Sequence, residues 1–177
     1  MKDQLTISSA YEWSKDRKPN SSEKAFKHLV KMIQSRFDGK TNKLNYKINY
    51  RRLRASAGKT MLESILKRID DSEIIIFDIS EKNPNVFLEL GIALACSARN
   101  KYPLIYLIKK RNAESLLSQL PSDLQGYFVT EYIEDNSGKI TFKDNGSLRL
   151  SIESDVKEYF NQINGFSQIN EIEYDAD

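Results

Sequence analysis

Residues 73–96 read EIIIFDISEKNPNVFLELGIALAC and carry the strongest structural signal in the chain. The run from Glu73 to Ser80 is almost continuously apolar, which is typical of a central parallel strand covered by helices on both faces. Asn83 then offers an N-cap, and Pro84 stands at the first helical position, where a missing N–H costs nothing. A helix is expected from there to about Ala98. This strand–helix unit predicts an α/β fold.

Strand and helix signals alternate on both sides of this unit. Two capping boxes, Asn20 with Glu23 and Thr60 with Glu63, predict the starts of two earlier helices. Further strands are expected at residues 5–11, 45–53, 103–109 and 126–133, a short helix at 114–120 and a last helix at 148–163. Residues 139–142 fit an extra strand, and the start of the last helix would also suit a strand.

This alternation requires parallel pairing of the strands. We therefore expect a three-layer α/β sandwich, with a flavodoxin-like, five-stranded, mainly parallel sheet and helices on both faces. Residues 1–165 are expected to form a single domain, and the acidic residues 166–177 a disordered tail.

The composition is that of an ordinary globule, with 40% hydrophobic and 29% charged residues among 177. No apolar run reaches the ~20 residues that span a bilayer, and no secretory signal is expected. Cys96 is the only cysteine, so a reducing cytoplasm is the expected location. Residues 1–68 hold 17 Lys and Arg against 6 Asp and Glu, which we interpret as a solvated basic face rather than a nucleic-acid surface. His28 is the only histidine and is expected at the surface, so a metal site and Ser-His catalysis are not expected. No cofactor is expected either.

Ligands of parallel sheets bind beyond the carboxyl ends of the strands, so the loop after Phe77 is the main candidate site. Asp78 closes an apolar strand, where an acid has no packing role. Glu89 is the only charged residue in an apolar helix, so it must be paired, neutralised or facing a ligand. The alternative is structural: Asp78 accepts backbone N–H groups and Glu89 pairs with an arginine. Gly91 costs the helix about 1 kcal/mol, which suggests close approach of a ligand or another backbone.

Glu89 and Asp78 are the candidate catalytic residues. The candidate substrate-binding residues are Ser8, Ser9, Tyr11, Arg51, Arg52, Ser80, Asn83 and Asn85. Arginine forks suit phosphate, although a solvated basic loop that includes Arg54 is the alternative. Tyr11 and Trp13 would either stack on a base or cover the edge of the core.

The stretch from Asp78 to Ala93, DISEKNPNVFLELGIA, resembles the signature of nucleoside 2-deoxyribosyltransferase-like proteins and their TIR-like nucleotide-binding relatives. In the deoxyribosyltransferases the matching helix glutamate attacks the anomeric carbon, and the preceding aspartate contacts the ribose or base. Glu89 and Asp78 stand at those positions. The resemblance implies N-glycosidic chemistry on a nucleoside, nucleotide or NAD-like molecule, and many relatives serve bacterial antiviral defence.

Three hypotheses follow from these observations. The first is a nucleotide N-glycosidase or deoxyribosyltransferase-like enzyme, in which Glu89 is the nucleophile or stabilises an oxocarbenium ion. The second is a non-catalytic module that senses a nucleotide, and the third is a TIR-like signalling module that associates with itself. A homo-oligomer is expected, since sites in the resembled families often borrow residues from a neighbouring subunit.

Overall fold

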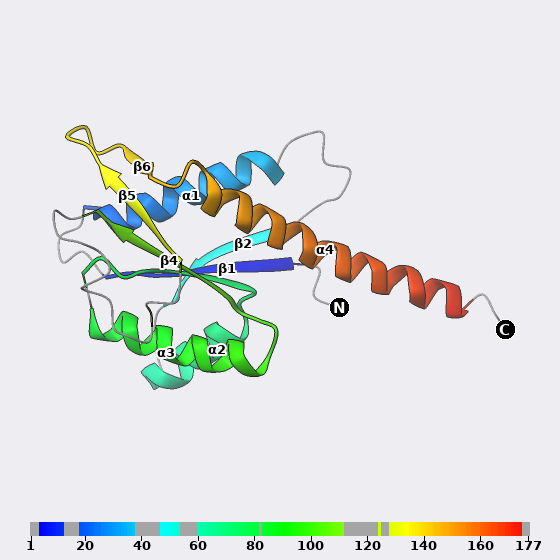
Figure 1. Ribbon diagram of the computed structural model, residues 1–177. Coiled ribbons are helices and arrows are strands. Elements are labelled where there is room, and N and C mark those ends of the chain that lie inside the picture. Colours follow the sequence, from blue (N-terminus) through cyan, green and yellow to red (C-terminus); the bar gives the residue numbers. More distant parts are fainter. Residues whose placement is uncertain are drawn as a thin grey trace.

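The computed structural model describes residues 4–12, 18–37, 47–53, 60–81, 83–111, 124 and 128–174. Within these residues six strands and four helices follow one another along the chain (Figure 1). They are β1 (Gln4–Ala10), α1 (Ser21–Phe37), β2 (Lys47–Arg52), α2 (Met61–Asp70), β3 (Ile74–Asp78), α3 (Pro84–Arg99), β4 (Leu104–Lys110), β5 (Val129–Glu134), β6 (Ile140–Phe142) and α4 (Ser147–Tyr174).

The strands form one mixed sheet in the order β2-β1-β3-β4-β5-β6. The first five are parallel, and β6 pairs antiparallel with β5. The expectation of five strands was therefore incomplete, because residues 139–142 do supply a sixth. A tight turn makes this hairpin possible: Gly138 has φ 81°, a conformation that glycine adopts without steric cost.

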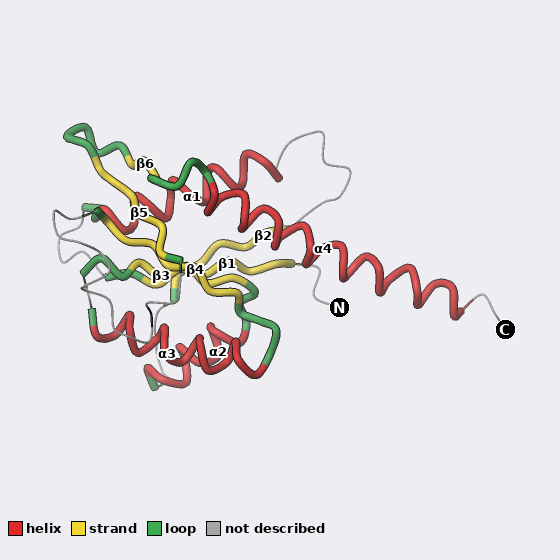
Figure 2. The backbone as a smooth tube through the Cα atoms, viewed as in Figure 1, coloured by secondary structure: helices red, strands yellow, loops and turns green. Residues whose placement is uncertain are grey.

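Helices cover both faces of the sheet, as Figure 2 shows: α1 and α4 lie on one face, and α2 and α3 on the other. Alternate residues of each strand point to opposite faces, so Ile74 and Ile76 join the core under α1 and α4, whereas Ile75 and Phe77 join the core under α2 and α3. All five residues of β3 are buried, which confirms the central strand that its apolar sequence predicted.

Local sequence signals start the helices as expected. Thr60 and Glu63 form a complete capping box at α2, with the Glu63 N–H donating to Thr60 Oγ1 at 3.2 Å. Asn83 caps α3 with Pro84 at its first position. At α1 the Glu23 N–H donates to Asn20 Oδ1 at 2.9 Å.

Two helices differ from expectation. The last helix, α4, is helical from Ser147 and runs to Tyr174, past its expected end near Ile163 and through most of the segment expected to be disordered. Apolar residues at Ile169 and Ile172 continue the helical spacing of the sequence. Gly165 destabilises the helix by only about 1 kcal/mol relative to alanine, which is too little to end it. The predicted helix at 114–120 lies outside the described residues.

The second difference concerns α3, which is apolar but not buried all round. Its buried residues are Val86, Leu90 and Ala93, whereas Leu88 is 58% exposed. A Cβ added at Gly91 would meet nothing within 4 Å, so no other described part of the chain approaches this glycine closely. The buried residues face the sheet, whereas Leu88 and Gly91 lie on an exposed side of the helix.

None of the helices in the described ranges is long and apolar enough to cross a membrane.

Candidate functional site

The site lies where the chain changes direction across the sheet. From β1 the chain crosses to β2 on one side and then returns to β3 on the other, so the carboxyl ends of β1 and β3 flank a topological switch point. The loop after β1 begins with Tyr11 and Glu12, and the loop after β3 leads to Asn83. Asn83 Nδ2 donates to Glu12 Oε1 at 3.3 Å and so joins the two loops.

Glu89 lies in the second turn of α3 and is half-buried. Burial raises the pKa of its carboxyl to about 7, although the positive charge of Arg52 partly opposes the shift. No described residue donates a hydrogen bond to Glu89 or forms an ion pair with it within 4 Å. Its carboxyl is therefore shielded from solvent in part, has no salt-bridge partner within the described part of the chain, and has a pKa near neutrality.

Asp78 is in a different situation, because its carboxyl is buried and fully engaged. Oδ1 accepts from the Ser80 N–H at 2.9 Å and from the Ser80 hydroxyl, and Oδ2 accepts from Tyr132 Oη at 2.8 Å. The side chain of Ser22, in α1, also favours the charged form of this carboxyl. Burial raises the pKa of Asp78 in spite of these bonds. These contacts match the structural alternative for Asp78, which organises the loop after β3.

The two adjacent arginines at the end of β2 have separate roles. Arg51 is committed to the α2 side, where it donates to Ser8 Oγ at 3.2 Å and to the Arg68 carbonyl at 2.7 Å. It also lies 3.9 Å from the Asp71 carboxylate. Arg52 points to the other face and donates to the Tyr11 carbonyl at 2.6 Å. Of the two, only Arg52 acts electrostatically on Glu89.

Tyr11, in the loop after β1, helps to hold the Arg52 side chain in place. The Arg52 guanidinium lies 3.9 Å from the centre of the Tyr11 ring, which is within the range of a cation–π contact. Ser8 is fully buried and shares a 2.7 Å hydrogen bond with Ser72, so its hydroxyl is engaged within the protein. Ser9 is 1% exposed, and its Oγ has no hydrogen-bond partner among the described residues.

The remaining candidates lie at the start of α3 and before it. Ser80 is buried, binds Asp78 and accepts from the Lys110 N–H at 2.7 Å, so it ties the loop after β3 to the end of β4. Asn83 accepts from the Asn85 N–H at 2.9 Å, and the Asn85 side chain is exposed. Trp13 and Arg54 lie outside the described residues.

Two contributors were missed from the sequence. Glu12 directly follows Tyr11 in the loop that the switch-point rule selects, so attention to every polar residue of that loop would have found it. Tyr132 is 54 residues from Asp78 along the chain, and no sequence signal links the two.

No family model matches the chain, and no curated protein matches it. The chemistry of the site must therefore be judged from its own residues. A carboxyl with a pKa near neutrality, a guanidinium whose charge acts on it and polar groups from two loops suit binding of a polar, anionic ligand and attack on an electrophilic carbon. We call Tyr11, Glu12, Arg52, Asn83 and Glu89 the switch-point site.

Proposed function

We propose that the chain is a nucleotide N-glycosidase or deoxyribosyltransferase-like enzyme. It would cleave the bond between base and ribose in a nucleoside, nucleotide or NAD-like molecule. The observation that carries the proposal is Glu89, a half-buried carboxyl without a structural partner among the described residues, with its pKa raised to about 7. Its motif, Asp78 to Ala93, is the stretch that resembles the deoxyribosyltransferase signature.

The position of the site supports a nucleotide ligand. The five parallel strands follow the order 2-1-3-4-5, and we propose a flavodoxin-like classification for them on this basis. In such sheets nucleotide cofactors bind at the switch point between the first and third strands. The switch-point site occupies the same place relative to the strands. A cytoplasmic location, where such ligands are abundant, belongs to the same proposal.

In the proposed reaction the ionised Glu89 carboxylate approaches the anomeric carbon. An oxygen of Glu89 forms a bond to that carbon, or stabilises its positive charge, while the electron pair of the C–N bond leaves with the base. The base takes a proton from water. A second water molecule or a second base then releases the sugar from Glu89, which gives hydrolysis or transfer respectively.

The geometry refines the roles of the other residues. Arg52 becomes the proposed phosphate contact, because its charge acts on Glu89 whereas Arg51 lies on the α2 side with Arg68 and Asp71. Asp78 becomes a positioning residue rather than a catalytic one, because Ser80 and Tyr132 already occupy its carboxyl.

The test is incubation of the purified chain with a panel of nucleosides, nucleoside phosphates and NAD, followed by chromatography for free base. Wild-type protein should release base from at least one compound, and Glu89→Gln should release none while keeping its thermal unfolding transition. Glu158→Gln is the matched control, since Glu158 is an exposed glutamate in a helix on the opposite face. Base release by Glu89→Gln at the wild-type rate would end the proposal.

A second candidate is a nucleotide-sensing or self-associating signalling module, which one observation favours. Large apolar side chains are exposed on α2 and α3: Leu62 at 52%, Leu66 at 37% and Leu88 at 58%. Clusters of exposed apolar residues often mark protein interfaces, so a homo-oligomer through this face is part of this candidate. Analytical ultracentrifugation should show an oligomer that Leu62→Asp with Leu88→Asp dissociates. A wild-type monomer with and without nucleotide would exclude it.

A further inference from the structure

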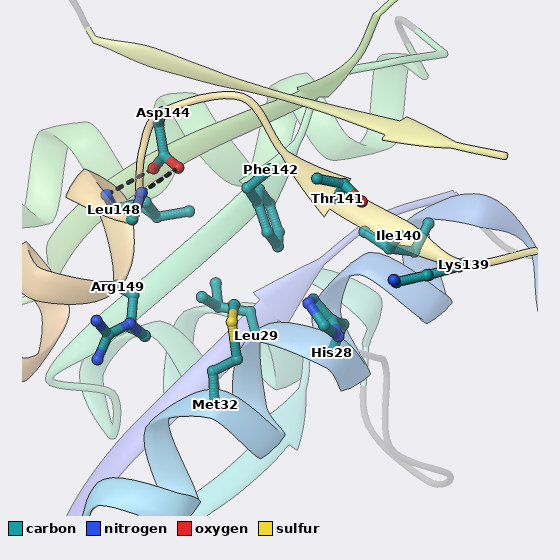
Figure 3. Close-up of a pocket in the computed structure, with 11 residues that line it drawn as sticks. His28, Leu29, Met32, Lys139, Ile140, Thr141, Phe142, Asp144, Leu148 and Arg149 are labelled. Carbon is teal, nitrogen blue, oxygen red and sulfur yellow. Dashed lines mark hydrogen bonds between the residues drawn. The ribbon is translucent and has the colours of Figure 1, made fainter.

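A groove lies on the opposite face of the sheet from α3. It has a volume of about 340 Å³ and is bounded by α1, by β6 and by the first turn of α4 (Figure 3). This volume falls at the lower end of the range for small-molecule sites. Glu89, Arg52, Glu12 and Asn83 are absent from its lining, so it is separate from the switch-point site.

The floor of the groove is apolar and partly aromatic. Leu29 and Leu148 are buried beneath it, and Met32 reaches in from α1 (Figure 3). The rings of His28 and Phe142 are nearly parallel, with an interplanar angle of 19° and centroids 6.2 Å apart. A flat apolar body would therefore find ring faces and a flexible thioether to pack against.

The charges around the groove favour an anion. Arg149 and Lys139 contribute two cations, whereas Asp144 contributes the one carboxylate of the lining. That carboxylate is already engaged at the start of α4: its oxygens accept from the Leu148 N–H at 2.7 Å and the Gly146 N–H at 3.1 Å (Figure 3). Asp144 therefore does not neutralise the two cations.

Arg149 has donors left for a ligand. Its Nη1 donates to Glu153 Oε1 at 2.5 Å, and Glu153 is 3% exposed. The second oxygen of Glu153 lies 3.8 Å from Arg36 Nε, so two arginines share one buried carboxylate and one positive charge is not balanced within the cluster. Among the described residues, Nε and Nη2 of Arg149 have no acceptor. A carboxylate accepts well from a guanidinium with two neighbouring free donors.

We propose that this groove binds a small aromatic carboxylate. The ring lies on the floor formed by Phe142 and Met32, and the carboxylate accepts from Nε and Nη2 of Arg149. The charge complementarity with Arg149 and Lys139 selects an acid over a neutral molecule of the same shape. This inference does not depend on the activity of the switch-point site.

The test uses phenylacetate as the probe and phenylacetamide as its neutral counterpart. The full-length chain carrying ¹³C-methyl methionine is titrated with each, and the Met32 signal, assigned with Met32→Leu, is followed by NMR. Phenylacetate should shift this signal saturably, and phenylacetamide should bind at least about tenfold more weakly because it lacks the charge.

Three variants make the test specific. Arg149→Met should weaken phenylacetate binding by at least about tenfold, and Met32→Trp, read by calorimetry, should abolish it by filling the groove. Arg99→Met, an exposed arginine of α3, should bind as wild type does. Each variant must keep a cooperative thermal transition. The absence of a saturable shift up to about 10 mM phenylacetate, equal binding of the amide, or unchanged binding by Met32→Trp would overturn the proposal.

Discussion

Replacing Glu89 with glutamine should stabilise the protein at alkaline pH and leave its stability unchanged at acid pH. Folding raises the pKa of this carboxyl from 4.5 to about 7 because burial disfavours the charged form. Between these values the folded state binds more protons than the unfolded state, so the free energy of unfolding falls as pH rises. The penalty is absent below about pH 4.5 and complete above about pH 7. Glutamine does not ionise, so the Glu89→Gln variant does not have this penalty.

The size of the effect follows from the shift. At about 1.36 kcal/mol per pKa unit, the rise from 4.5 to about 7 sets an upper limit of about 3.4 kcal/mol. Because Glu89 is only half-buried, solvent screening reduces this to about 1–2 kcal/mol. For a chain of this size that stabilisation raises the melting temperature by about 3–6 °C.

The assay is urea unfolding of wild type and Glu89→Gln at pH 4.5, 6 and 8, with Glu158→Gln as the exposed control. The advantage of Glu89→Gln should grow through this series, while the control shows no comparable trend. If Glu89→Gln were instead less stable than wild type at pH 8, the carboxylate would be serving as a structural partner of Arg52. The reasoning that assigns it to a ligand would then fail.

Three other substitutions test the framework around the site. Tyr132→Phe removes the hydroxyl that donates to Asp78 in the core, and should lower the free energy of unfolding by about 1–3 kcal/mol in urea. Gly91→Ala should raise the free energy of unfolding by up to about 1 kcal/mol. The added methyl group meets nothing within 4 Å, and alanine favours the helical conformation more than glycine does. Glu134→Gln should destabilise the protein at neutral pH, because Lys24 and Ser21 lower the pKa of Glu134 to about 2 in the folded state. The loss of stability should shrink as the pH falls from about 4.5 toward 2, and thermal unfolding across that range measures it.

Each of these has a contrary result. If Tyr132→Phe left the free energy of unfolding unchanged, water would be replacing the phenol hydroxyl. If Gly91→Ala lowered the free energy of unfolding, a neighbour would approach α3 at this position. A Glu134→Gln loss that stays constant with pH would show that packing, rather than charge, dominates at this residue.

Local features were predictable because their causes are local. The capping box at Thr60 and the N-cap at Asn83 depend on residues within one turn, and both are present in the structure. The apolar run of β3 identified a strand buried on both faces for the same reason: every side chain in it gains from burial. The candidate Glu89 was found because one charge stood alone in an apolar helix.

The hydrogen-bond partners of Arg51 and Arg52 were not predictable from the sequence. Strand periodicity sends them to opposite faces, but only the assembled sheet decides that one face offers Ser8, Ser72 and the Arg68 carbonyl. The absence of a neighbouring backbone at Gly91 was not predictable either, because the apolar composition of α3 does not say how many neighbours surround the helix.

The sequence alone determined where strands and helices begin, and which carboxyl lacked an obvious structural role, because caps, turns and hydrophobic periodicity act between residues close in the chain. The tertiary structure decided which polar groups meet. Tyr132 satisfies Asp78 across 54 residues, and Arg149, Phe142 and His28 come together across more than a hundred residues of sequence. Such long-range contacts depend on strand order and on which helix covers which face of the sheet. These are properties of the whole packed core.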